Sequence, residues 1–109
     1  MLDYSKENAD ELAKDFELLT GINLCNDSRE TEIMITRTLF YKVLKDLNFM
    51  NDRMISEWFA LRGAKKGRSS ITHALTKIGV YYKSYANFRT KYNIYFNDKA
   101  EEFITLEKS

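Results

Sequence analysis

The chain has 109 residues, of which 44% are hydrophobic, and a formal net charge of only +1; this length suits a single domain, residues 1–109, with a core of its own. Its one cysteine, Cys25, excludes an internal disulfide and favours a reducing compartment. No apolar run approaches the roughly 20 residues that a membrane span needs, and the first residues do not resemble a signal peptide. We therefore expect a cytoplasmic protein that does not bind membranes.

Charge is unevenly distributed along the chain. Residues 1–32 carry a net charge of −6, residues 33–91 a net charge of +9 and residues 92–109 a net charge of −2. A basic segment between two acidic ones points to a polyanionic partner. An unevenly charged surface that binds nothing explains the pattern equally well, so the motifs must decide.

The composition predicts an all-helical protein, because the chain has no proline, only four glycines and no long β-branched run. Apolar residues at helical spacing predict a small bundle of five to six helices. The expected helices cover about residues 6–19, 30–49, 52–62, 69–84, 86–93 and 98–107. The helix over 30–49 is the most apolar, and we expect it to form the centre of the core.

Polar residues before these segments predict where the helices begin. The expected caps are Ser5 or Asn8, Asn51 or Asp52, Ser69 or Ser70, and Asn97, and Gly21 is expected to end the first helix. In the third helix Trp58 stands among apolar residues, which favours a core position over a base-stacking role.

The part of the chain with a recognisable chemical pattern is the stretch from 62 to 77. Four of the seven residues over 62–68 are basic, and Gly63 and Gly67 allow the backbone to turn sharply. The following helix buries Ile71, Ala74, Leu75, Ile78 and Tyr82 and exposes Ser69, Ser70, Thr72, His73, Thr76 and Lys77. Lysine and arginine side chains bind phosphates, and short polar side chains reach the edges of the DNA bases in the major groove. The pattern therefore predicts a helix-turn-helix.

Seven aromatic residues follow, from Tyr81 to Phe96. We first interpret these residues as the side chains that complete the core. Interleaved with Lys83, Arg89 and Lys91, they could instead stack on the bases of a single strand, or form a contact surface for a protein partner or for self-association.

Sequence patterns of several other classes of site are missing. There is no glycine-rich phosphate loop that ends in Lys-Ser/Thr and no Cys/His cluster for zinc. His73 is the only histidine, and no nucleophile elbow accompanies it. We therefore expect no catalysis, no cofactor and no metal.

Over about residues 9–80, the order of elements resembles the C-terminal DNA-binding domain (domain IV) of the bacterial replication initiator DnaA. The closest stretch is Ser69–Ile78, Ser-Ser-Ile-Thr-His-Ala-Leu-Thr-Lys-Ile, which is similar to the family's Thr-Thr-Val-x-His-Ala-x-x-Lys-Ile. Arg37 and the helix end Leu44–Leu47 resemble its Arg-Gln…Ala-Arg-Glu-Leu helix.

Two further stretches carry the resemblance and two depart from it. Ile55 and Phe59 stand like the Ile and Phe of the family's first helix-turn-helix helix, and Leu24–Arg29 is similar to the start of its basic loop. Thr31, however, stands where the family's minor-groove Arg is expected, and Lys65–Arg68 replaces Gly-Arg-Asp-His in a longer turn.

The resemblance implies an all-helical bundle of the Trp-repressor-like type. It implies a recognition helix in the major groove of DNA and a basic loop in the minor groove. Ser69 and Ser70 would then touch bases or phosphates, and His73 would be structural.

We therefore expect a double-stranded DNA-binding protein, acting as a replication accessory or a transcriptional regulator, with a core over 9–80 and a helical extension over 81–109. The expected DNA-binding residues are Arg29, Arg37, Arg62, Lys65, Lys66, Arg68, Ser69, Ser70, Thr72, His73 and Lys77. The alternative is a protein-interaction or structural module that kept the fold without DNA recognition.

Overall fold

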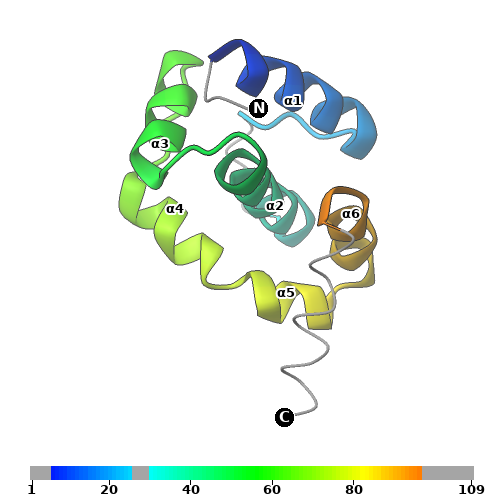
Figure 1. The fold of residues 1–109 in the computed structure, drawn as a ribbon. Helices are drawn as coiled ribbons and strands as arrows, with labels where there is room; N and C mark the ends of the chain where they lie inside the picture. Colours follow the sequence, from blue (N-terminus) through cyan, green and yellow to red (C-terminus); the bar gives the residue numbers. More distant parts are fainter. Residues whose placement is uncertain (1–5, 26–29, 97–109) are drawn as a thin grey trace.

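The protein is a small all-helical bundle, as the composition predicts. The computed structural model describes residues 6–25 and 30–96, and within those ranges it contains six helices and no strand (Figure 1). They are α1 (Lys6–Thr20), α2 (Thr31–Leu47), α3 (Asp52–Leu61), α4 (Arg68–Leu75), α5 (Ile78–Ser84) and α6 (Ala86–Phe96). The helix predicted over 98–107, with its cap Asn97, lies outside the described residues, as does Ser5.

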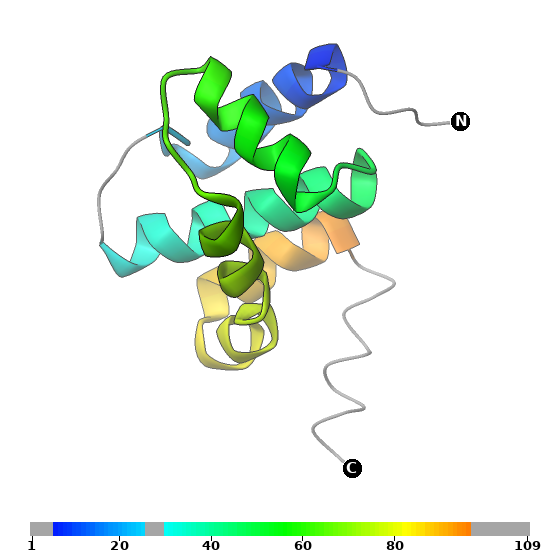
Figure 2. The same cartoon turned by 90° about the vertical axis from the view of Figure 1, so that its left-hand side faces the viewer.

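Helix α2 forms the centre of the bundle, which confirms the prediction from its apolar pattern. The other five helices surround it in Figure 1, and each of them contacts it. Figure 2 shows α2 between α1 and α3 on one side and α5 and α6 on the other. Its eight buried residues are Ile35, Thr36, Thr38, Leu39, Phe40, Tyr41, Val43 and Leu44. The two buried threonines donate their hydroxyls to carbonyls of the preceding turn, so they carry no unpaired polar group into the core.

Aromatic rings connect the helices around α2. The ring centroid of Phe40 lies 5.1 Å from that of Phe16 on α1 and 5.6 Å from that of Trp58 on α3. The aromatic residues of the last two helices complete this core as predicted, since Tyr82, Phe88, Tyr92 and Phe96 are buried in the same cluster. Within the described ranges, no helix is long and apolar enough to cross a membrane.

Helix α3 begins and ends as local sequence dictates. Asn51 caps it, because its side-chain oxygen accepts the backbone N–H of Met54 at 2.9 Å. At its end the N–H of Gly63 donates to Ala60 and the N–H of Ala64 donates to Phe59. This Schellman arrangement needs a left-handed residue, and Gly63 supplies it with a φ of +82°.

Two predicted boundaries at α4 are wrong, α6 ends at Phe96 rather than at residue 93, and one of the two alternative caps of α1 is excluded. The helix expected over 69–84 is divided into α4 and α5, because the N–H groups of Thr76 and Lys77 bond three residues back and the Thr76 hydroxyl donates to the His73 carbonyl. Neither Ser69 nor Ser70 caps α4, which begins one residue earlier, after Gly67. Asn8 lies inside α1 rather than at its start, whereas α1 does end before Gly21 (φ +74°).

The same substitution should change the stability of the protein in opposite directions at the two glycines of the turn, Gly63 and Gly67. Gly63→Ser places a side chain in the left-handed region and should destabilise the protein by about 1–2 kcal/mol. Gly67 has an ordinary φ of −63° and no capping side chain, so Gly67→Ser should stabilise by about 0.5 kcal/mol. Urea unfolding of both variants measures the difference; equal effects at the two positions would contradict this assignment of the turn.

Candidate nucleic-acid interface

Between α2 and α4 lies a groove of about 390 Å³ that gathers most of the predicted DNA-binding residues. We call it the basic groove. Its lining includes six of those residues: Arg37, Lys65, Lys66, Ser70, His73 and Lys77. The remaining wall consists of Met34, Thr38, Tyr41, Gly67, Ala74 and Tyr81, so no described residue that lines the groove is acidic.

The α3–α4 connection is held rigidly enough to position its two lysines. The Ser56 hydroxyl on α3 donates to the carbonyl of Lys66 at 2.6 Å. On either side of this bond, Ala64 and Ile71 are buried in the core. Lys65 and Lys66 therefore project from a backbone that is anchored at both ends rather than from a free loop.

Two tyrosines, Tyr41 and Tyr81, belong to the wall of the basic groove. Burial raises the pKa of Tyr41, although the charge of Arg37 and its hydrogen bond to the phenol partly offset this. Burial also raises the pKa of Tyr81, with a further contribution from Tyr85. Both side chains thus stay neutral at neutral pH and add no negative charge to the groove.

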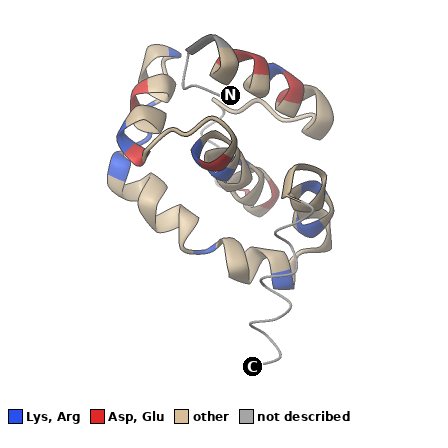
Figure 3. Cartoon of the chain, in the orientation of Figure 1, with Lys and Arg blue, Asp and Glu red and all other residues tan. Residues whose placement is uncertain are grey.

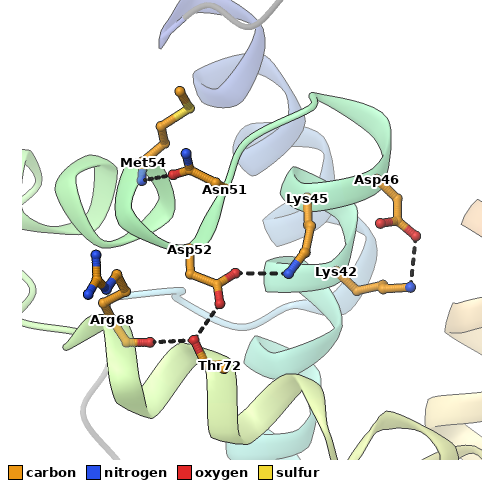
Figure 4. A network of polar contacts seen from close by, with 8 residues as sticks. All are labelled: Lys42, Lys45, Asp46, Asn51, Asp52, Met54, Arg68 and Thr72. Atoms are coloured by element: carbon orange, nitrogen blue, oxygen red, sulfur yellow. Dashed lines mark hydrogen bonds and ion pairs between the residues drawn. The ribbon is translucent and has the colours of Figure 1, made fainter.

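On the other side of α4 a polar network joins α4 to α3 (Figure 4). The Thr72 hydroxyl donates to the carboxylate of Asp52, and Lys45 on α2 pairs with the same carboxylate at 3.1 Å. Thr72 also bonds the carbonyl of Arg68 at 3.0 Å. Thr72 is therefore a bridge between helices, a role that its position on the polar face does not reveal.

Asp52 is stabilised in its charged form by this network. Burial works to raise the pKa of Asp52, but the hydrogen bonds from Thr72 and Lys45 and the charges of Lys45 and Arg68 outweigh it and lower the pKa below its ordinary value. Its carboxylate also lies in the first turn of α3, where negative charge is favoured.

Of the other five predicted residues, four are described and do not line the basic groove, and the fifth, Arg29, is not described. Arg62 turns back to α1, where its guanidinium lies 4.3 Å from the centroid of Trp58 and 3.6 Å from Asp10. Trp58 is buried and donates to the same carboxylate, which confirms its predicted place in the core. Ser69 is exposed outside the groove, Arg68 and Thr72 lie on the α3 side, and Arg29 falls outside the described residues.

The structure also gathers basic residues that sequence reasoning did not single out. These are Lys45 and Arg53, which line a polar hollow of about 490 Å³ together with Asn51, Asp52 and the predicted residue Arg68. No local signal marks Lys45 and Arg53, which stand near Asp46, Asp52 and Glu57 in the sequence, whereas no acidic residue occurs between Glu57 and Asp98. In Figure 3 the charged positions of α4, α5 and α6 are accordingly all basic, whereas α1 carries most of the acidic bands.

No family model, curated protein or solved structure matches this chain. The resemblance to the DnaA domain therefore stays a prediction. Among the residues that the structure describes, no group of three His, Cys, Asp or Glu side chains could hold a metal ion.

The lowered pKa of Asp52 predicts a pH-dependent contribution to stability. Because its pKa is lower in the folded state than the ordinary value of 3.8, the contribution is complete above that value and is lost as the pH falls through the folded pKa. Asp52→Asn should cost about 1 kcal/mol at pH 6, and this difference from wild type should shrink as the pH is lowered towards 3. Urea unfolding at both pH values provides the test; a difference that does not change with pH contradicts it.

Proposed function

We propose that the protein binds double-stranded DNA through α4 and the basic groove, in the manner of a helix-turn-helix formed by α3 and α4. The observation that carries the proposal is the groove itself. Four cationic side chains (Arg37, Lys65, Lys66 and Lys77) converge on it, with no acidic residue among its described lining residues. Cations gathered in one concave surface attract the phosphate backbone whatever its sequence.

The two sides of α4 suggest how a duplex would sit. The basic groove lies along one side, and Lys45, Arg53 and Arg68 lie on the other. A helix that enters the major groove has a phosphate strand on each side, so cations on both flanks match that geometry. The exposed residues of α4 between these flanks, Ser69, Ser70 and His73, then face the base edges.

In this proposal the recognition helix enters the major groove, as the resemblance to the DnaA domain implies, but the residues that contact DNA differ from those predicted. Arg62 belongs to the packing of α1 against α3, and Thr72 to the bridge with Asp52. Arg37, Lys65, Lys66 and Lys77 hold phosphate, and the neutral side chains of Tyr41 and Tyr81 form part of the wall behind them. A role in replication or in transcriptional regulation is the context that we propose for such a domain.

The alternative is a protein-interaction module that uses the aromatic residues from Tyr81 onwards as its contact surface. Fewer of these side chains are exposed than the sequence suggests. Four of the seven aromatic rings between Tyr81 and Phe96 are buried, which leaves Tyr85 and Ile94 as the largest exposed apolar side chains of α6 and the preceding turn. Light scattering coupled to size exclusion separates the two functions, because a stable oligomer without DNA affinity supports the alternative.

Salt dependence of duplex binding tests the phosphate contacts. If about five phosphates are neutralised, the plot of log K against log salt should have a slope of about −4.5, and Lys66→Ala combined with Lys77→Ala should make it less steep by about 2. Fluorescence anisotropy with a labelled duplex measures both slopes.

A matched control removes the same charge elsewhere. Lys14 on α1 and Lys83 on α5 are exposed and lie outside the basic groove. Their double alanine variant should keep most of the wild-type slope. Equal losses in the two double variants, or no binding of any duplex at low salt, would contradict the proposal.

Ser70 should contribute to sequence preference rather than to affinity. Its side chain lines the basic groove and does not cap α4, so Ser70→Ala removes a donor and acceptor without weakening the helix start. Selection of bound duplexes from a random pool should show an altered preferred sequence at similar affinity; an unchanged preference would assign Ser70 no base contact.

A further inference from the structure

A second groove, of about 500 Å³, lies between the carboxyl end of α2 and the junction of α4 and α5. We call it the apolar groove. Its surface is formed by Leu75, Ile78, Gly79 and Val80, with Thr76 beside them, and its rim on α2 and α5 carries Lys42, Lys45, Asp46 and Lys83. It shares no lining residue with the basic groove.

The apolar groove is open to solvent and positively charged at its edge. Val80 is 58% exposed although it is a valine in a helix that packs on the core. Lys42 pairs with Asp46 at 2.8 Å and Lys45 pairs with Asp52 at 3.1 Å, so three lysines against two carboxylates leave the rim with an excess of one positive charge, at Lys83. A ligand for this surface must therefore combine apolar side chains with negative charge.

The chain itself contains a segment with that chemistry. The 13 residues that follow Phe96 lie outside the described residues and carry a net charge of −2. Their apolar side chains are Ala100, Phe103, Ile104 and Leu106, and their acidic ones are Asp98, Glu101, Glu102 and Glu107. The spacing of Ala100, Phe103 and Ile104 places all three on one face of a helix.

The segment also begins on the correct side of the molecule and is long enough. Helix α6 ends at Phe96 on the side where the last turns of α2 lie (Figure 2). Phe103 stands seven residues after Phe96, and an extended chain of that length spans about 23 Å. The end of α6 lies against α5, the helix that carries Val80, because the Tyr82 hydroxyl donates to the Asn93 side chain at 3.1 Å. Residues 97–109 can therefore reach the apolar groove without a rearrangement of the six helices.

We propose that residues 97–109 dock in the apolar groove of their own chain. Phe103 and Ile104 cover Val80 and Leu75, and the acidic side chains face Lys42, Lys45 and Lys83. Burial of the apolar side chains supplies the attraction, and the opposite charges set the orientation. This docking does not depend on DNA binding.

Disulfide trapping in the full chain tests the proposal. In a Cys25→Ser background, Val80→Cys is combined with Thr105→Cys, which leaves Phe103 and Ile104 in place. The control combines Leu61→Cys with Thr105→Cys, because Leu61 is 67% exposed on α3 and outside the groove. Docking raises the effective concentration of the two thiols, so the first pair should form an intramolecular disulfide about tenfold faster than the control pair. Because opposite charges orient the segment, 0.5 M salt should reduce the ratio between the two rates of disulfide formation.

Hydrogen exchange in the otherwise unmodified chain provides the second readout. Amides of residues 97–109 should be protected, and Val80→Asp should abolish that protection while Leu61→Asp, at a similarly exposed position, should not. Equal trapping rates for the two cysteine pairs would overturn the proposal. So would predominantly intermolecular disulfides, which would assign the groove to a second copy, or protection that Val80→Asp leaves intact.

Discussion

Within residues 6–25 and 30–96, every other helix covers part of α2. The helix buries residues on nearly all of its sides, from Ile35 to Leu44, and leaves only its ends and a few polar positions in contact with water. A helix that is apolar around most of its circumference must be surrounded, and α1, α3, α4, α5 and α6 do so (Figure 1). The same burial creates the candidate site, because the face of α2 from Met34 to Tyr41 becomes one wall of the basic groove.

The opposite wall is positioned by a small number of local bonds. Gly63 turns the chain out of α3, the Ser56 hydroxyl holds the carbonyl of Lys66, and Asp52 holds Thr72 on α4. These contacts fix α4 relative to α3 before any ligand arrives. A preformed surface loses less conformational entropy on binding, so its cations can contribute more of their interaction energy to affinity.

Local patterns in the sequence were sufficient to predict the helices and several of their ends. The apolar periodicity predicted α2 as the centre, Asn51 as a cap and Gly21 as a stop, since each depends on neighbours within one turn. The break between α4 and α5 was missed because it arises from the Thr76 hydroxyl bonding a backbone carbonyl, which competes with the continuing apolar stripe.

The candidate site was predictable in composition but not in geometry. The basic turn and the polar face of the fourth helix identified five residues of the basic groove: Lys65, Lys66, Ser70, His73 and Lys77. Their grouping with Arg37, about thirty residues earlier in the chain, depends on how α4 crosses α2. Arg62 was assigned to DNA because it stands in a basic run, yet Trp58 and Asp10 hold it against α1, and Asp10 is too distant in sequence for any local pattern to pair them.

The most direct test of the account is to map the DNA-binding surface itself. Amide and side-chain NMR shifts of the labelled protein, followed during titration with a duplex at low salt, should change most at Arg37 and across Lys65–Lys77, while the residues of α1 stay constant. Shifts centred on α1 or α6, or none anywhere, would contradict the assignment of the basic groove to DNA.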